Sequence, residues 1–118
     1  EWDYYLPWKP NVPPKVNLGW LRAIYLGHKE LKNEFRLNKP ILLMHSSHSS
    51  WNNNDIQIVQ SSDIILNVDD IIRVSKNIKG NIETIAVKNG MHDLVLSAPI
   101  VRNEVYKVMR NWIVKNKL

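Results

Sequence analysis

The chain has 118 residues, a formal net charge of +5, no cysteine and an apolar content of 44%. This length allows at most one domain with a modest core, and the apolar content is too high for a disordered chain. The absence of thiols excludes disulfide bonds and thiolate metal sites.

The positive charge raises the question of a nucleic-acid partner, and the placement of the basic residues argues against one. They become dense only near the end, at Lys115 and Lys117. A nucleic-acid surface gathers its basic side chains on one face and carries a recognisable motif. We therefore predict a solvated basic surface and no nucleic-acid partner. The scattered basic residues are Lys9, Lys15, Arg22, Lys29, Lys32, Lys39, Arg73 and Lys76.

No segment has the length and apolarity of a membrane span, since no apolar run approaches about 18 residues. No signal peptide is visible at the beginning of the sequence. We therefore expect no membrane span and a cytoplasmic location. The sequence begins at Glu1 without a methionine, and we expect it to be cut from a longer protein.

The first stretch, 1–14, is rich in aromatic residues and proline, and its prolines exclude a helix. Its aromatic side chains are too many for a free linker, so we expect core or interface packing, or the lining of a pocket. The segment from Asn17 to about Lys32 has apolar residues at helical spacing and a plausible N-cap in Asn17, which predicts a helix. The residues concerned in 1–14 are Trp2, Tyr4, Tyr5, Pro7, Trp8, Pro10, Pro13 and Pro14.

Two strands are predicted in the rest of the chain, at 41–45 and at 82–87. The first is a continuous apolar run, typical of a strand that is buried on both faces of a parallel sheet. A polar connector, 33–39, precedes it, and a long polar loop, 46–62, follows it. The apolar residues of 68–78 recur with the period of a helix. The order of elements therefore alternates between strand and helix.

The helix at 68–78 carries end signals in the sequence. Asn67 is a cap, and Asp69 and Asp70 are favourably placed in the first turn, where negative charge opposes the helix dipole. Gly80 is a good C-terminal stop. The two aspartates are therefore explained most economically as helix-end charges.

The last helix is predicted to begin at Ser97, with Ser97 as its cap and Pro99 in its first turn. Its basic end suits the negative pole of the helix dipole. A stripe of apolar residues is expected to face the core. It consists of Val101, Val105, Val108 and Trp112, with Met109 and Ile113 beside it.

An acid and a histidine follow the two strands. Strands that alternate with helices pair in parallel, so the loops that carry Asp63 and His92 open at one edge of the sheet, where ligands bind in such folds. An acid can hold one nitrogen of an imidazole while the other nitrogen takes a proton from a nucleophile. The alternative is that His92, in its Gly-Met-His turn, has no chemical role.

Two other histidines, His45 and His48, are three residues apart. They leave the first strand and enter a loop, and no second pair of ligands follows at a recognisable spacing. We therefore predict no metal site, and we expect no cofactor.

Three segments resemble the serine aminopeptidase (S33) or lysophospholipase-like branch of the α/β-hydrolase superfamily. They are 40–50 (PILLMHSSHSS), 62–68 (SDIILNV) and 90–97 (GMHDLVLS). The stretch 19–24 (GWLRAI) also resembles the segment of that branch before its last strands. The resemblance covers nearly the whole chain, and His-Asp-x-x-Leu-Ser is its most specific part. It implies the C-terminal part of an α/β-hydrolase fold.

The resemblance makes His92 the catalytic histidine and Asp63 the acid of a catalytic triad. Many α/β-hydrolases place the acid closer to the strand, near Ser49 in this sequence, and a serine cannot serve as the acid. Asp55 and Asp63 are the nearest alternatives. We favour Asp63, because the Ile-Ile-Leu-Asn-Val that follows it resembles the Asp-x-Val-Leu stretch of that branch, whereas Asp55 stands in a run of asparagines.

The resemblance also shows what the chain lacks, since it contains no Gly-x-Ser-x-Gly. In this family the nucleophile elbow and the oxyanion hole lie upstream of the acid. Four serines follow the first strand, and none has the context of an elbow. They are Ser46, Ser47, Ser49 and Ser50.

We therefore interpret 1–38 as a cap or pre-strand region and 39–118 as the C-terminal strand-helix-strand-helix part of the hydrolase domain. The chain is predicted to supply the acid and the histidine of a serine hydrolase for ester or related acyl substrates, small or lipid-like. Alone it should be inactive and prone to self-association, because its partner, the N-terminal part of the fold, is missing.

An alternative interpretation is a non-catalytic interaction module that keeps the hydrolase scaffold. In that case the aromatic stretch from Trp2 to Trp8 would be the surface that binds a partner.

Overall fold

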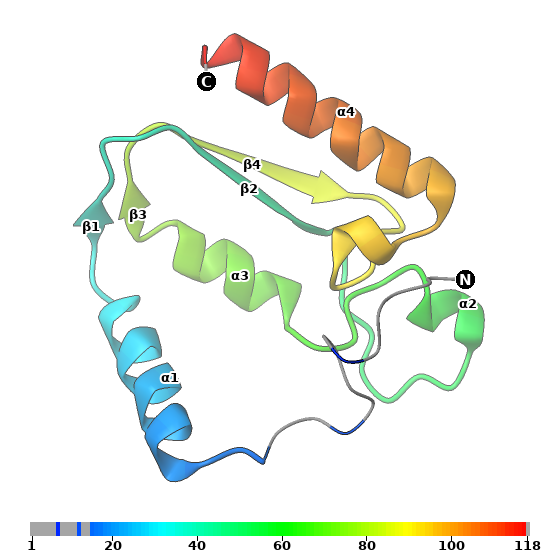
Figure 1. Ribbon diagram of the computed structural model, residues 1–118, viewed down its shortest axis with the longest axis horizontal. Helices are drawn as coiled ribbons and strands as arrows, with labels where there is room; N and C mark the ends of the chain where they lie inside the picture. The colour runs from blue at the N-terminus through cyan, green and yellow to red at the C-terminus, as the bar shows by residue number, and fades with distance from the viewer. Residues whose placement is uncertain (1–6, 8–11, 13–14, 118) are drawn as a thin grey trace. The chain divides into compact units, whose positions relative to one another are not determined.

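A computed structural model of the chain describes residues 7, 12 and 15–117, in two compact units that meet between Asn33 and Glu34. Most of the aromatic and proline residues of 1–14, including the stretch assigned to a partner surface, lie outside the described residues. The helices, strands and one 3₁₀ helix, η1, are labelled in Figure 1. In chain order they are α1 (Leu18–Glu30), β1 (Phe35–Arg36), β2 (Ile41–Ser46), α2 (Ile56–Val59), α3 (Val68–Ser75), β3 (Ile78–Lys79), β4 (Ile82–Val87), η1 (Leu94–Leu96) and α4 (Pro99–Lys115).

The first unit contains α1, which begins where the sequence predicted. The side chain of Asn17 caps it by accepting a hydrogen bond of 2.8 Å from the N–H of Trp20. None of its residues is buried. The predicted helix and its cap are therefore confirmed.

The second unit is built around two parallel strands, β2 and β4. They pair in register from Ile41 opposite Ile82 to Ser46 opposite Val87. Figure 1 shows α3 and α4 on opposite sides of these strands, so that a helix lies on each face. This arrangement confirms the two predicted strands and agrees with the predicted α/β class.

The structure corrects the expected connections around the sheet. The connector 33–39 contains β1, which pairs in parallel with β3, a strand of two residues. Because Ile78 belongs to β3, the helix predicted over 68–78 ends at Ser75. Gly80 follows β3 instead of ending a helix, at φ +144°. Two-residue strands have too few residues to show a period, which is why the pattern did not predict them.

The long loop predicted over 46–62 also contains an element of its own. α2 is one turn of helix, and the side chain of Asp55 caps it by accepting a hydrogen bond of 2.9 Å from the N–H of Gln57. The cap at Asn67 is confirmed in the same way, by a bond from the N–H of Asp69 to its side chain. Asp69 and Asp70 lie in the first turn of α3, as expected of helix-end charges, and Asp70 forms an ion pair with Arg73 in the last turn.

The core of the described residues is small and contains more polar than apolar side chains. Val68 on α3 and Val105 on α4 are its buried hydrophobic residues. The other residues of the predicted stripe on α4 are only partly covered or exposed. Most of the buried polar residues belong to the loops that follow β2 and β4; the full set is His45, Ser46, Ser62, Asp63 and Ser97.

Each strand of the central pair has one edge without a strand beside it among the described residues. The N–H groups of Ile41 and Ser47 donate to carbonyls at the β4 side. Since N–H directions alternate along a strand, those of Leu42 and Met44 point away from β4. None of the described helices has the length and apolarity needed to cross a membrane.

Candidate functional site

Asp63 is placed by a short parallel bridge between the segment after β2 and the segment before α3. Its N–H donates to the carbonyl of His48, and its carbonyl accepts from the N–H of Ser50, both at 3.0 Å. The bridge pairs Ser49 with Asp63. As a result, the Asp63 side chain is buried at the carboxyl end of the sheet, where the sequence predicted an acid.

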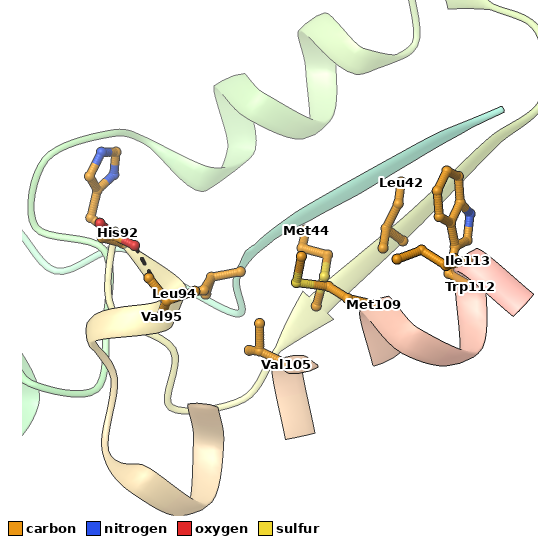
Figure 2. Close-up of a pocket in the computed structure, with 10 residues that line it drawn as sticks. Leu42, Met44, His92, Leu94, Val95, Val105, Met109, Trp112 and Ile113 are labelled. Atoms are coloured by element: carbon orange, nitrogen blue, oxygen red, sulfur yellow. Dashed lines mark hydrogen bonds between the residues drawn. The ribbon is translucent and has the colours of Figure 1, made fainter. Parts of the chain in front are cut away.

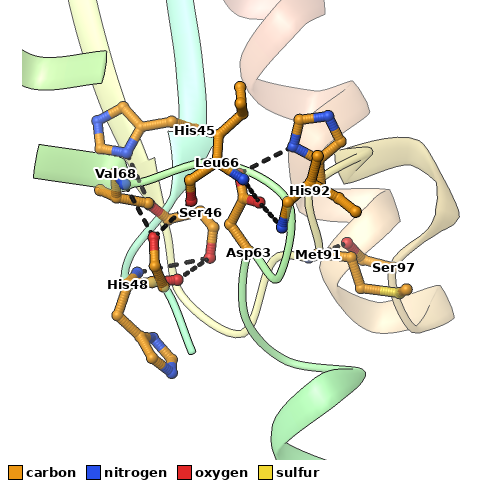
Figure 3. Close-up of polar contacts among 11 residues, drawn as sticks. His45, Ser46, His48, Asp63, Leu66, Val68, Met91, His92 and Ser97 are labelled. Atoms are coloured by element: carbon orange, nitrogen blue, oxygen red, sulfur yellow. Dashed lines mark hydrogen bonds and ion pairs between the residues drawn. The ribbon is translucent and has the colours of Figure 1, made fainter. Parts of the chain in front are cut away.

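Both oxygens of the Asp63 carboxylate are engaged, as Figure 3 shows. Oδ1 accepts hydrogen bonds of 2.8 Å from the N–H groups of Ile65 and Leu66. Oδ2 accepts from Nδ1–H of His92 at 2.9 Å. Two backbone amides thus fix the carboxylate through one oxygen, while its other oxygen is bound to the imidazole.

His92 stands on the loop that follows β4. Asn89 turns the chain in the left-handed region, at φ +58°. Gly90 comes next, where a Cβ would lie 2.6 Å from a methyl carbon of Leu94, so only glycine fits without a shift. The loop is therefore shaped by Asn-Gly, and it brings the imidazole to the Asp63 carboxylate.

The two members of this pair differ in their access to solvent. The side chain of His92 is 40% exposed, whereas that of Asp63 is 3% exposed. Among the described residues, Nδ1 of His92 has a hydrogen-bond partner and Nε2 has none. The ring is thus held at one nitrogen and leaves the other available to a reactant.

The pKa of Asp63 lies below its usual value of 3.8. Burial of the carboxyl raises the pKa, but the N–H of Leu66, the His92 side chain and the N–H of Ile65 together outweigh that effect. Asp63 is therefore ionised at neutral pH and is an acceptor for the ring N–H of His92.

The lowered pKa makes the folded state sensitive to acid. A carboxyl with a lower pKa when folded stabilises the fold above its unfolded pKa, and this contribution is lost as the pH falls through the folded value. We expect the free energy of unfolding to fall more steeply below pH 3.8 in the wild type than in Asp63→Asn. Denaturant titrations between about pH 6 and pH 2 measure this difference. Equal slopes in the two proteins would contradict the prediction.

The second candidate acid, Asp55, lies apart from the pair. Its carboxylate caps α2 and contacts the N–H of Gln57. The structure gives it no hydrogen bond or ion pair with His92, whereas Asp63 has both. Of the two candidates, only Asp63 has the geometry of an acid beside the histidine.

The four serines at the end of β2 and just after it form hydrogen bonds to groups other than His92. Ser46 Oγ donates to the carbonyl of His48, and Ser47 Oγ contacts Nδ1 of the same histidine at 3.1 Å. Ser49 Oγ donates to the carbonyl of Leu66 and accepts from the N–H of Val68, both at 2.8 Å. Ser50 Oγ contacts Ser62 Oγ. Three of these hydroxyls brace the loop around Asp63, and none of the four bonds to the imidazole of His92.

Ser97 has a different role from the one predicted. The N-cap residue of α4 is Ala98, without a side-chain bond, while Ser97 Oγ accepts from the N–H of Met91 at 2.9 Å. A serine two residues before Pro99 matches a helix-start pattern. The group that binds its hydroxyl instead is the N–H of Met91, six residues earlier in the loop. A local pattern gives no signal for that bond.

An apolar pocket of about 620 Å³ lies between β2, η1 and α4. Figure 2 shows His92 at one end of it and Trp112 and Ile113 at the other. Leu42 and Met44 contribute the β2 wall. The face of the sheet beside the pair is therefore apolar and incompletely covered by α4.

The described residues contain no group of three or more histidine or acidic side chains that could hold a metal ion. His45 is buried, and its Nδ1–H donates to the carbonyl of Ser46 at 2.6 Å. His48 is exposed and contacts Ser47. The two histidines three residues apart thus have separate surroundings.

Comparison of the chain with protein-family models, curated proteins and solved structures finds no match. The chemistry open to the Asp63–His92 pair therefore follows from its own contacts. A buried, ionised carboxylate that fixes one nitrogen of a half-exposed imidazole orients that ring for proton transfer at the other nitrogen.

Proposed function

We propose that this chain is the C-terminal part of a serine hydrolase of the α/β-hydrolase type that acts on ester or related acyl bonds. Asp63 is the acid of its catalytic triad and His92 the base. The observation that carries the proposal is the 2.9 Å hydrogen bond between Oδ2 of Asp63 and Nδ1 of His92. The resemblance of 90–97 to the serine aminopeptidase and lysophospholipase-like branch supports it.

In this mechanism His92 moves a proton at Nε2. The bond to Asp63 keeps the proton of the neutral ring on Nδ1, so Nε2 has a lone pair for the hydroxyl proton of a serine. As that proton arrives, the ring becomes an imidazolium, and the buried carboxylate stabilises its charge. His92 then returns the proton from Nε2 to the leaving group.

The nucleophile and the oxyanion hole belong to the part of the protein that precedes this chain. In α/β-hydrolases the serine comes before the acid and the histidine in sequence. None of the four serines at the end of β2 and just after it bonds to His92. The uncovered edge of β2 and the apolar pocket beside it are where further strands and helices of that fold would pack.

The proposal is tested on the protein encoded by the complete reading frame, with a fluorophosphonate probe that labels activated serines. His92→Ala should lower the labelling rate by about 10² to 10⁴, the usual contribution of general acid–base catalysis. His48→Ala is the matched control, because His48 is exposed and has no carboxylate partner among the described residues. The 118-residue chain alone should remain unlabelled.

Two results would overturn this proposal. One is labelling that does not depend on His92, which would make the histidine irrelevant to the nucleophile. The other is a folded, complete protein that the probe does not label at all. The Asp63–His92 pair would then belong to a scaffold without hydrolase chemistry.

A further inference from the structure

The loop that carries His92 is closed by a side chain that the triad does not include. After β4, the N–H of Gly90 donates to the carbonyl of Val87 at 3.2 Å. The N–H of the next residue, Met91, donates to Ser97 Oγ at 2.9 Å. Figure 3 shows Ser97 beside Met91, with His92 next in the chain. The bond thus ends one residue before the imidazole.

Ser97 is itself fixed in the fold. It is buried, with 2% of its surface exposed. Its N–H donates to the carbonyl of Leu94, the first residue of η1, and α4 begins two residues after Ser97 at Pro99. The hydroxyl therefore ties the amide before His92 to the start of the longest helix in the described chain.

Asp63, the hydrogen-bond partner of His92, has little freedom to follow a displaced imidazole. Oδ1 of Asp63 is bound by two backbone amides, and the carboxylate is buried. A loop shift of a few tenths of an ångström would therefore lengthen the contact between Oδ2 and Nδ1 instead of moving both groups together. The alignment of the pair depends on how firmly the loop at 88–97 is held.

We propose that Ser97 is a positioning residue for His92, because its buried hydroxyl holds the N–H of Met91 and so keeps the imidazole against Asp63. The inference rests on the proposed function for its catalytic meaning, since it acts through the histidine. How firmly the loop keeps the imidazole of His92 in place can be measured without an activity assay.

The experiment follows the Nδ1 proton of His92 by NMR in the protein encoded by the complete reading frame, at a pH where the ring is neutral. A proton held by a carboxylate resonates downfield and exchanges slowly with water. Ser97→Ala removes the acceptor and keeps the Cβ, and should raise the exchange rate about fivefold, as expected for the loss of one hydrogen bond. Ser97→Cys, with a weakly accepting sulfur of similar size, should give a smaller increase.

The matched control is Ser75→Ala. Ser75 also uses its hydroxyl in one hydrogen bond to the backbone, as the donor to the carbonyl of Ile72 in α3, and no hydrogen bond joins it to the His92 loop among the described residues. A general loss of stability would accelerate exchange in both variants, so faster exchange in Ser97→Ala alone supports positioning. If Ser97→Ala does not fold, Ser97→Cys against Ser75→Ala gives the same comparison.

Failure of this inference is distinguishable from failure of the proposed function. A slow Nδ1 proton in the wild type that is unchanged in Ser97→Ala or Ser97→Cys overturns the role of Ser97 and leaves the pair intact. A wild-type Nδ1 proton that exchanges with water too fast to be observed overturns the pair itself, and with it both proposals.

Discussion

Asp63→Asn is expected to lower the rate of fluorophosphonate labelling of the complete protein by about 10⁴, the cost of the same change in a serine protease triad. Asparagine keeps the shape of the side chain but carries an NH₂ group, which can donate to Nδ1 of His92. The neutral ring would then hold its proton on Nε2. A protonated Nε2 cannot accept the hydroxyl proton of a serine. Labelling rates of wild type and variant at one probe concentration measure the loss.

Asp55→Asn is the matched control for this result. Asp55 caps α2, and asparagine caps a helix about as well as aspartate. Labelling should therefore change by less than about twofold, because the pair is untouched. A larger loss in Asp55→Asn than in Asp63→Asn would give the acid role to Asp55.

Gly80→Ala is expected to lower the free energy of unfolding by about 3 kcal/mol. Gly80 has φ +144°, a conformation that residues with a Cβ rarely adopt. An added Cβ would also overlap the backbone oxygen of Leu37, which lies next to β1. The substitution therefore strains the turn and the β1–β3 pairing together. Urea unfolding followed by circular dichroism measures the change.

Gly27→Ala separates this effect from a general intolerance of glycine replacement. Gly27 lies in α1, and apart from its two chain neighbours and the backbone of its own helix, nothing is within 4 Å of a Cβ built there. Alanine should favour the helix by about 1 kcal/mol, so this variant should be no less stable than the wild type. If Gly80→Ala were equally harmless, the tight turn after β3 would not exist as described.

The sequence predicted those features that depend on local patterns. The apolar run 41–45 and the segment 82–87 became β2 and β4, and Asn17 and Asn67 became helix caps. Parallel pairing then brought the loops that carry Asp63 and His92 to one edge of the sheet, although the two residues are far apart in sequence. A rule of topology was sufficient to place the two loops at one edge, whereas the choice of Asp63 over Asp55 depended on the resemblance.

Features that depend on distant partners were not predictable in this way. Ser97 satisfies a helix-start pattern, yet its hydroxyl bonds to Met91 in the loop. Ser49 bridges the carbonyl of Leu66 and the N–H of Val68, and nothing in its own surroundings in the sequence indicates this. Local competition between possible partners is decided by the tertiary structure, because side-chain hydroxyls can bond in many directions.

The way in which Asp63 is anchored has a consequence for sequence divergence. Its Oδ1 is held by the peptide N–H groups of Ile65 and Leu66, whose side chains are 56% and 47% exposed. Every amino acid except proline carries that group. Related sequences are therefore free to drift at positions 65 and 66 while the acid keeps its place. In an alignment, this site would be recognised by the absence of proline at positions 65 and 66, and not by a preserved residue there.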